Sequence, residues 1–224
     1  IVRSLVGSEM CIRDRDLFDC EYWSLEQAKL GKGAPPKFQG KVVMITGGSG
    51  TIGFAIAEAF SKLGAQTILV DKDEIALKES VTKLGVGHKY FPIDVTHSDA
   101  ANQALLAAIN NFGGLDILIS NAGAAHAGPM LDISNEELRN AFELNFFSHY
   151  SFSTEAAKIL KDQNRGGQIL FNISKQAVNP GKNFGAYGLP KATTFFLMRQ
   201  LALELGSDGI RVNGINADRI RSGL

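Results

Sequence analysis

Residues 46–53 read TGGSGTIG, a glycine cluster between a short apolar run and an amphipathic segment. The run KVVMIT at 41–46 is rich in β-branched residues and predicts a strand, while residues 52–63 have helical apolar spacing. Gly47 permits a tight turn after the strand, and Gly53 permits close packing of the helix on a sheet. The N–H groups at the start of such a helix can bind phosphate. The segment therefore predicts a strand–turn–helix unit that binds a dinucleotide.

The alternation of apolar runs and amphipathic segments continues along the chain. Further strands are expected at residues 67–71, 89–93, 115–119, 168–173 and 210–215. Further helices are expected at residues 74–84, 98–111, 134–162 and 186–205. Continuously apolar strands that alternate with helices are typical of a parallel sheet. The predicted fold class is α/β, a Rossmann-type doubly wound parallel sheet with helices on both faces.

The first residues do not follow this alternation. Residues 1–15 include LVGSEMCIRDR, which resembles a translated sequencing adapter, so we interpret them as a non-native segment. A targeting peptide is the alternative, but charged residues interrupt any apolar core. Residues 16–38 are expected to be the end of an upstream unit followed by a Pro/Gly linker. The domain at 39–224 is expected to be truncated before a seventh strand.

Composition and charge narrow the classes of partner. The chain is 45% apolar and 21% charged, as is typical of a soluble globular protein. Lys plus Arg and Asp plus Glu each total 23, so no basic field predicts binding to nucleic acid or to a membrane. Two cysteines, Cys11 and Cys20, suit a reducing cytoplasm. The four histidines lack metal-ligand spacing, so no metal site is expected.

An acidic residue ends the second expected strand. Asp71 lies 18 residues after Gly53, where a carboxylate can accept hydrogen bonds from the adenosine ribose and repel a 2′-phosphate. This position favours NAD over NADP, although Lys72 could soften the discrimination. The alternative interpretation is a solvated aspartate at a strand end. Asp94 and Val95 end the third strand and are expected to meet the adenine.

Three residues near the fifth strand form a candidate catalytic group. Tyr187 and Lys191 are four residues apart, so both side chains lie on one helix face. A free tyrosine has a pKa near ~10, and a nearby ammonium together with a positively charged nicotinamide ring would lower it toward the range of a general base. Ser174 lies thirteen residues before Tyr187, at the end of a strand. Most Tyr-x-x-x-Lys pairs are solvated helix faces, so the spacing is informative only together with the glycine loop.

With these motifs, residues from about 39 to 211 resemble a short-chain dehydrogenase/reductase of the classical type. The resemblance rests on the glycine loop, Asn121-Ala122-Gly123, Asn145, Ser174, Tyr187 with Lys191, and IRVNGIN at 210–216. It implies that Tyr187 is the general acid/base and that Ser174 holds the substrate oxygen. It also implies that Lys191 binds the nicotinamide ribose and lowers the tyrosine pKa, and that Asn145 steadies a water between Lys191 and solvent. The expected cofactor-binding residues are Gly47, Ser49, Gly50, Thr51, Ile52, Gly53, Asp71, Asp94, Val95, Asn121, Ala122, Gly123, Tyr187 and Lys191.

Two departures from the classical pattern stand out. Thr51 replaces the middle glycine of Thr-Gly-x-x-x-Gly-x-Gly, and the loop as written fits the extended branch of epimerases and dehydratases. Asn121-Ala122-Gly123 and the lack of room for a larger substrate domain favour the classical type. Ala217-Asp218 stands where classical members usually have Pro-Gly.

A closer resemblance is to the C-terminal half of bifunctional aldolase/short-chain dehydrogenases. It is carried by DLFDCEYWSLEQAKL, NISKQAVNPGKNFGAYGLPKAT and NADRIRSGL. It implies fusion to an upstream aldolase, homo-oligomers, and a small hydroxyl or carbonyl substrate such as lactaldehyde, a sugar-derived hydroxy-aldehyde. Candidate pocket residues are His126, Gln176 and Asn179. A non-catalytic NAD-binding module of an aldolase, or an extended-type epimerase, remains an alternative.

Overall fold

The computed structural model describes residues 35–218 of the chain. The chain divides into a unit of Ile1–Lys37 and a unit of Phe38–Leu224. The expected adapter segment, most of the expected upstream unit and linker at 16–38, both cysteines and residues 219–224 lie outside the described residues.

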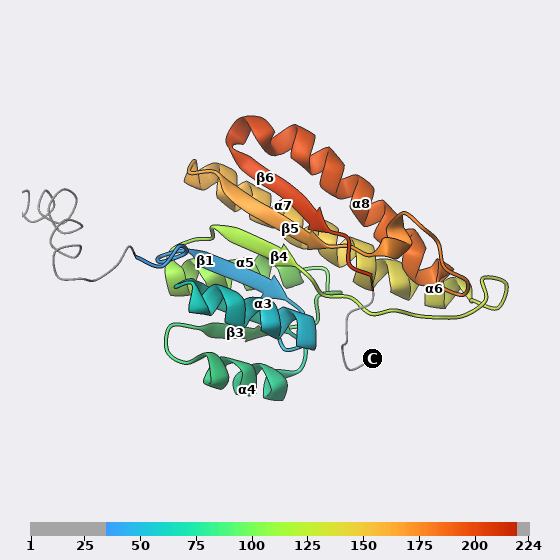
Figure 1. Ribbon diagram of the computed structural model, residues 1–224, viewed down its shortest axis with the longest axis horizontal. Helices are drawn as coiled ribbons and strands as arrows, with labels where there is room; N and C mark the ends of the chain where they lie inside the picture. The colour runs from blue at the N-terminus through green and yellow to red at the C-terminus, as the bar shows by residue number, and fades with distance from the viewer. Residues whose placement is uncertain (1–34, 219–224) are drawn as a thin grey trace, which may run out of the picture. The chain divides into compact units, whose positions relative to one another are not determined.

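The described strands form one parallel sheet in the order β3-β2-β1-β4-β5-β6 (Figure 1). They are β1 (Val42–Thr46), β2 (Gln66–Asp71), β3 (Lys89–Pro92), β4 (Ile117–Ser120), β5 (Gly167–Asn172) and β6 (Ile210–Ile215). Val43 of β1 pairs with Thr67 of β2 on one side and with Ile117 of β4 on the other. The strand order reverses between β1 and β4, and ligands of open α/β sheets bind at the carboxyl ends of strands at such a reversal.

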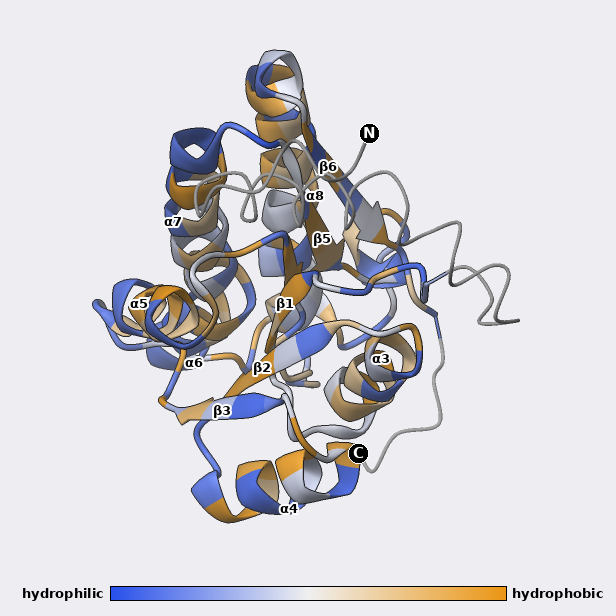
Figure 2. Cartoon of the chain, turned by 90° about the vertical axis from the view of Figure 1, so that its left-hand side faces the viewer, coloured by the Kyte–Doolittle hydropathy of each residue, from blue (hydrophilic) through white to orange (hydrophobic). Residues whose placement is uncertain are grey.

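Helices cover both faces of the sheet, so the predicted fold class is confirmed. The helices are α3 (Thr51–Lys62), α4 (Glu74–Leu84), α5 (Ala100–Phe112), α6 (Asn135–Phe142), α7 (Ser148–Gln163) and α8 (Gly185–Leu205), with short turns η4 (Lys175–Ala177) and η5 (Gly206–Asp208). One core cluster joins Val43, Ile45 and Leu69 to Ala57 of α3 and Leu77 of α4. In Figure 2 the apolar strand β1 lies between α3 and the helices α5 and α7.

The second core cluster lies on the opposite face of the sheet. It joins Met44 and Phe171 to residues of α5, α7 and α8, among them Leu105, Phe152 and Leu201. Neighbouring strand residues thus face opposite clusters, as the two-residue period of a strand requires. No helix among residues 35–218 is long and apolar enough to span a membrane.

The expected single helix at 134–162 is wrong in its middle. A π-helical segment, η3 (Glu143–Phe147), separates α6 from α7 and contains Asn145. Ser134 caps α6 reciprocally with Glu137, as a capping box does. Single π turns inside α-helices are frequent at functional sites, because the extra residue shifts the faces of the helix on either side.

Candidate active site

The glycine loop forms a tight turn between β1 and α3. Gly47 has a φ of 64°, which favours glycine, and the Gly48 N–H donates to the Val70 carbonyl at 3.1 Å. A Cβ on Gly53 would collide with the carbonyl oxygen of Gly47, so only glycine fits there. No side chain caps the start of α3 at Gly50. The helix N-terminus therefore presents its N–H groups to the cavity, in the arrangement that suits a pyrophosphate.

Asp71 lies at the end of β2, beside the glycine loop. Its Oδ2 accepts hydrogen bonds from the Ser49 N–H at 3.2 Å and from the Ser49 hydroxyl at 2.6 Å. Its Oδ1 accepts from the Lys72 N–H at 2.8 Å. An ionised carboxylate has about four acceptor positions, so capacity for a further donor remains. Ser49 thus fixes the orientation of Asp71.

Asn121 connects the ends of three strands. Its side-chain amide donates to the carbonyl oxygen of Thr46 at 2.9 Å, and its Oδ1 accepts from Asn172 at 2.9 Å. The Thr46 hydroxyl in turn accepts the N–H groups of Asn121 and Ala122 at 2.9 and 3.0 Å. These contacts fix the carboxyl ends of β1, β4 and β5 relative to one another.

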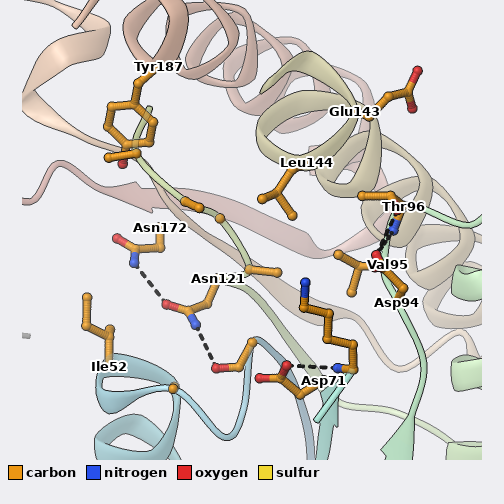
Figure 3. Close-up of a pocket in the computed structure, with 18 of the residues that line it drawn as sticks. Ile52, Asp71, Asp94, Val95, Thr96, Asn121, Glu143, Leu144, Asn172 and Tyr187 are labelled. Carbon is orange, nitrogen blue, oxygen red and sulfur yellow. Dashed lines mark hydrogen bonds between the residues drawn. The ribbon is translucent and has the colours of Figure 1, made fainter. Parts of the chain in front are cut away.

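A cavity of about 770 Å³ lies over these strand ends. Tyr187 and Asn172 lie on one side of it, and Asp94 and Thr96 on the opposite side (Figure 3). The predicted site residues that line the cavity are Gly47, Gly50, Thr51, Ile52, Gly53, Asp71, Asp94, Val95, Asn121, Ala122, Gly123, Tyr187 and Lys191. The glycine turn and the Tyr187–Lys191 pair therefore share one cavity.

Other predicted residues do not line this cavity. Ser49 acts on it only through Asp71, while Asn145 and Ser174 are buried beside it. The suggested pocket residues His126, Gln176 and Asn179 are also absent from the lining. The Gln176 side chain accepts the Gly181 N–H at 2.6 Å, so it stabilises the loop that precedes α8.

Sequence reasoning missed several lining residues. They are Ile93, Thr96, Ala124, Ala125, Asn140, Glu143, Leu144 and Asn172. Asn172 had a usable signal, since it lies one residue before the end of the expected strand at 168–173. Ile93, which ends the expected strand at 89–93, had a similar signal. Spacing alone gave none for the rest, because the turn after β3, the loop after β4, α6 and the π segment bring them to the cavity.

Asp94 is held by the turn that follows β3. Its Oδ1 accepts the Thr96 N–H at 3.0 Å and the Thr96 hydroxyl at 2.7 Å. The Thr96 N–H is the main cause of a lowered Asp94 pKa, against the raising effect of partial burial. Thr96 therefore holds Asp94 as an anion in a fixed orientation. Asp94 lies where the sequence predicts that the adenine binds.

Tyr187 and Lys191 lie on one face of α8, as predicted. The Lys191 Nζ lies 5.8 Å from the centre of the Tyr187 ring. Burial raises the pKa of Tyr187, and a hydrogen bond with Ser174 opposes that rise. Lys191 is not among the causes of this shift, so the lowering of the tyrosine pKa by Lys191 together with a charged nicotinamide ring stays a prediction. Burial raises the Tyr187 pKa because it disfavours the charged phenolate.

Lys191 is almost fully buried, with 2% of its surface exposed. Its Nζ donates to the Asn172 carbonyl oxygen at 3.1 Å and lies 3.2 Å from His149 Nε2. Burial lowers the pKa of Lys191 to about 7. At neutral pH the lysine is therefore close to its titration midpoint.

Asn145 lies in the π segment next to Lys191. Its side-chain N–H groups donate to the carbonyl oxygens of Ala124 and Ala141 at 3.0 and 3.1 Å. Its buried Oδ1 has no partner among the described residues. A Cβ on Gly123 would lie 2.8 Å from that oxygen and 3.2 Å from Lys191 Nζ. Gly123 thus leaves the two groups accessible to the same small space.

The departure at Ala217-Asp218 has local contacts of its own. The Ala217 carbonyl oxygen accepts the Lys175 N–H at 2.8 Å, and the Lys175 side chain pairs with Asp218 at 3.1 Å. Within residues 35–218, no group of three or more His, Cys, Asp or Glu side chains has the arrangement of a metal site.

Comparison with known proteins finds relatives that are named as oxidoreductases or dehydrogenases. It is 34% identical over 225 residues to "Uncharacterized oxidoreductase YuxG" of Bacillus subtilis, with 97% of this chain covered. The chain spans 32% of that relative's length. It is also 34% identical over 182 residues to 7alpha-hydroxysteroid dehydrogenase of Escherichia coli, covering 80% of this chain and 71% of that protein.

A solved structure shows the same fold. The 3-ketoacyl-(acyl-carrier-protein) reductase of Brucella melitensis, complexed with NADH, superposes with a TM-score of 0.81 at 27% identity. The match covers 83% of this chain and 78% of the reductase. A family model described as "short chain dehydrogenase" matches residues 41–224, the span that contains the glycine turn, Asp71 and the Tyr187–Lys191 pair. The chain belongs to the short-chain dehydrogenase/reductase family.

Proposed function

We propose that this chain is an NAD-dependent oxidoreductase domain that transfers a hydride between nicotinamide and a small hydroxyl or carbonyl substrate. The observation that carries the proposal is the shared cavity. The glycine turn at the start of α3 and the Tyr187–Lys191 pair line the same space of about 770 Å³. A dinucleotide-binding module without catalysis would not need the second group.

Several features support a nicotinamide dinucleotide as the cofactor. Gly53 and the uncapped start of α3 fit a pyrophosphate, and Asn121 fixes the strand ends beneath it. The Brucella melitensis reductase that shares the fold was solved with NADH. Asp71 supports NAD over NADP, because its carboxylate would repel a 2′-phosphate. The nicotinamide would supply the hydride donor or acceptor when bound.

The chain's own residues would handle the proton and the substrate oxygen. In carbonyl reduction, the Tyr187 hydroxyl gives its proton to the substrate oxygen, and the Ser174 hydroxyl holds that oxygen. The raised pKa of Tyr187 keeps the phenol protonated for this step. In alcohol oxidation, Tyr187 must accept the proton, so a charged Lys191 beside it favours the phenolate. Asn145 contributes through its buried Oδ1, which faces the space near Lys191.

The substrate class is a short hydroxy-aldehyde or its carbonyl counterpart, with lactaldehyde as the representative. The resemblance of residues 16–38 and of the segment around Tyr187 to bifunctional aldolase/dehydrogenases supports this choice. We propose on the same basis that the full-length protein carries an upstream aldolase unit. The family match favours the classical type over an extended-type epimerase.

Cofactor titration tests the assignment of Asp71. The chain should bind NADH more tightly than NADPH, and Asp71→Ala should narrow the difference because the repulsion of the 2′-phosphate is lost. Nicotinamide fluorescence measures both affinities. Asp73→Ala is the matched control, since Asp73 caps α4 and does not line the cavity. Tighter binding of NADPH by the unmutated chain would contradict the assignment.

A substrate panel tests the reaction class. Short hydroxy-aldehydes, polyols and deoxysugar derivatives should be offered with NAD, and NADH absorbance followed. Turnover should be highest for a small hydroxylated member. If NADH binds but no member of the panel reacts, the non-catalytic module becomes the better interpretation.

A further inference from the structure

A buried histidine lies behind the catalytic lysine. His149 of α7 is 1% exposed and packs beside Phe171 of β5, with ring centres 6.0 Å apart. Its Nε2 lies 3.2 Å from Lys191 Nζ, and its Nδ1 lies 2.6 Å from the Ser120 hydroxyl oxygen. The expected roles of Ser174, Tyr187, Lys191 and Asn145 assign nothing to His149. The histidine nevertheless contacts Lys191 directly. Lys191 in turn lies beside Tyr187.

The hydrogen-bonding capacity of the two side chains determines their roles. A lysine ammonium has three donors and no acceptor, so it can approach His149 Nε2 only if that nitrogen carries a lone pair. The ring proton then lies on Nδ1, which donates to the Ser120 oxygen at 2.6 Å. A charged His149 would present a proton to the ammonium and repel it. The charged lysine therefore requires a neutral His149 with its proton on Nδ1.

The burial of Lys191 makes the His149 acceptor important for the lysine charge. Lys191 has 2% of its surface exposed, so bulk water does not solvate its charge. The Asn172 carbonyl oxygen and His149 Nε2 are its two hydrogen-bond acceptors among the described residues. The pKa of His149 lies well below its ordinary value, mainly because of burial and secondly because of the Lys191 charge. The imidazole is thus a neutral acceptor throughout the physiological pH range.

We propose that His149 is a positioning residue that accepts a hydrogen bond from the Lys191 ammonium and thereby keeps a positive charge beside Tyr187. The Ser120 hydroxyl, which can donate or accept, is the partner of Nδ1 in the tautomer that makes this possible. The inference rests on the proposed function, because the charge matters to the reaction only if Tyr187 moves the proton. It extends the catalytic group into the interior, from Tyr187 through Lys191 and His149 to Ser120.

Loss of the acceptor should change the titration of the site. Without His149 Nε2 the ammonium loses one of two acceptors, so the pKa of Lys191 should fall further. Tyr187 would then lose its cationic neighbour near neutral pH, and alcohol oxidation would need a more alkaline solution. Other titratable groups lining the cavity are Asp71, Lys72, Asp94, Glu143 and Tyr187.

The direct test is a titration of Lys191 by NMR in the absence of cofactor. His149→Phe fills the space beside Phe171 without an acceptor, while His149→Gln restores an oxygen near the position of Nε2. Lys191→Arg identifies the lysine signal by its disappearance. The Lys191 pKa should fall by about one unit in His149→Phe and return toward the parent value in His149→Gln. An unchanged Lys191 pKa in a folded His149→Phe protein would overturn the proposal.

A measurement on the unmutated chain covers the case in which His149→Phe fails to fold. Nitrogen-15 shifts of the His149 ring near pH 6 should show a proton on Nδ1 and none on Nε2. A proton on Nε2 at that pH would exclude the lysine contact and overturn the proposal.

The pH profile of activity separates positioning from mere packing. In His149→Phe the activity of alcohol oxidation near neutral pH should fall more than the activity at alkaline pH, whereas a packing defect would lower kcat evenly at all pH values. His88→Phe is the control, because His88 is a half-buried histidine that is bonded to Ser61 and Thr67 and lies outside the cavity. It should leave the profile unshifted. Absence of turnover in the parent would contradict the proposed function, and the Lys191 titration would still decide the role of His149.

Discussion

Gly53 shows how a single residue serves both the fold and the site. Its lack of a Cβ lets the first turn of α3 approach the carbonyl oxygen of Gly47, which closes the turn below the cavity. Any larger residue must push α3 away from β1. The same displacement would move the helix N-terminus that is proposed to hold the pyrophosphate.

Gly53→Ala should therefore lower both stability and cofactor affinity. Overpacking of this kind typically costs about 1–3 kcal/mol of unfolding free energy. NADH affinity should fall at least about tenfold, which corresponds to ~1.4 kcal/mol. Gly206→Ala is the control, since a Cβ there meets nothing within 4 Å and φ is −60°. Denaturant unfolding and NADH fluorescence measure the two effects, and equal behaviour of the two variants would refute this account of Gly53.

Lys191 and Tyr187 mark the limit of sequence reasoning at this scale. Their spacing correctly predicts that they share a helix face and a cavity. The direction of the Tyr187 pKa depends on depth, which spacing does not encode, and burial raises it. His149 was missed for a similar reason. A histidine four residues after Asn145 has no recognisable role until the fold brings Lys191 to it.

At the scale of elements, apolar runs and helical spacing identify most of the architecture. All six expected strands are present, because continuous apolar runs of strand length leave few alternatives in an alternating chain. The π segment at Glu143–Phe147 was not predicted, since one extra residue in a turn barely alters the apolar period. Tertiary contacts stabilise it instead. The Thr194 hydroxyl donates to the Asn145 carbonyl oxygen at 2.8 Å and to the Pro190 carbonyl at 3.0 Å.

Thr194→Val tests that stabilisation of the π segment. Valine keeps the shape of threonine but removes the donor, so the Asn145 carbonyl loses this hydrogen bond. The free energy of unfolding should fall by about 1–3 kcal/mol in chemical denaturation. Thr193→Val on the same helix is the matched control, because the Thr193 hydroxyl bonds Leu189 at an exposed position. A loss in Thr194→Val no larger than in the control would contradict the role of Thr194.

For the whole molecule, the buried His149 and the half-buried His88 predict how stability depends on pH. Burial lowers the pKa of His88, and burial together with Lys191 lowers the pKa of His149. Unfolded histidine titrates near ~6.5, so the unfolded chain binds more protons than the folded chain below that pH. The stabilisation from the neutral histidines is complete above this value and is lost as pH falls.

The free energy of unfolding should accordingly decrease between pH 7.5 and 5.5. Denaturant titrations at several pH values within this range measure the slope. His88→Gln should make the slope shallower, since the contribution of His88 is then removed. His126→Gln is the control, because His126 lies at the surface beside Glu137. It should leave the slope unchanged. A stability that is constant across the range, or that rises toward pH 5.5, would contradict the neutral state of both histidines.

The central claim, that one cavity joins a dinucleotide site to a proton-transfer tyrosine, has a direct test in Tyr187→Phe. The variant removes the hydroxyl and keeps the ring, so the packing of α8 should persist. Turnover of the best substrate in the panel should fall at least about 100-fold, the lower range for a general acid/base. NADH affinity should change little, because the hydroxyl serves the substrate oxygen. Full turnover by Tyr187→Phe on a substrate that the parent uses well would contradict the account.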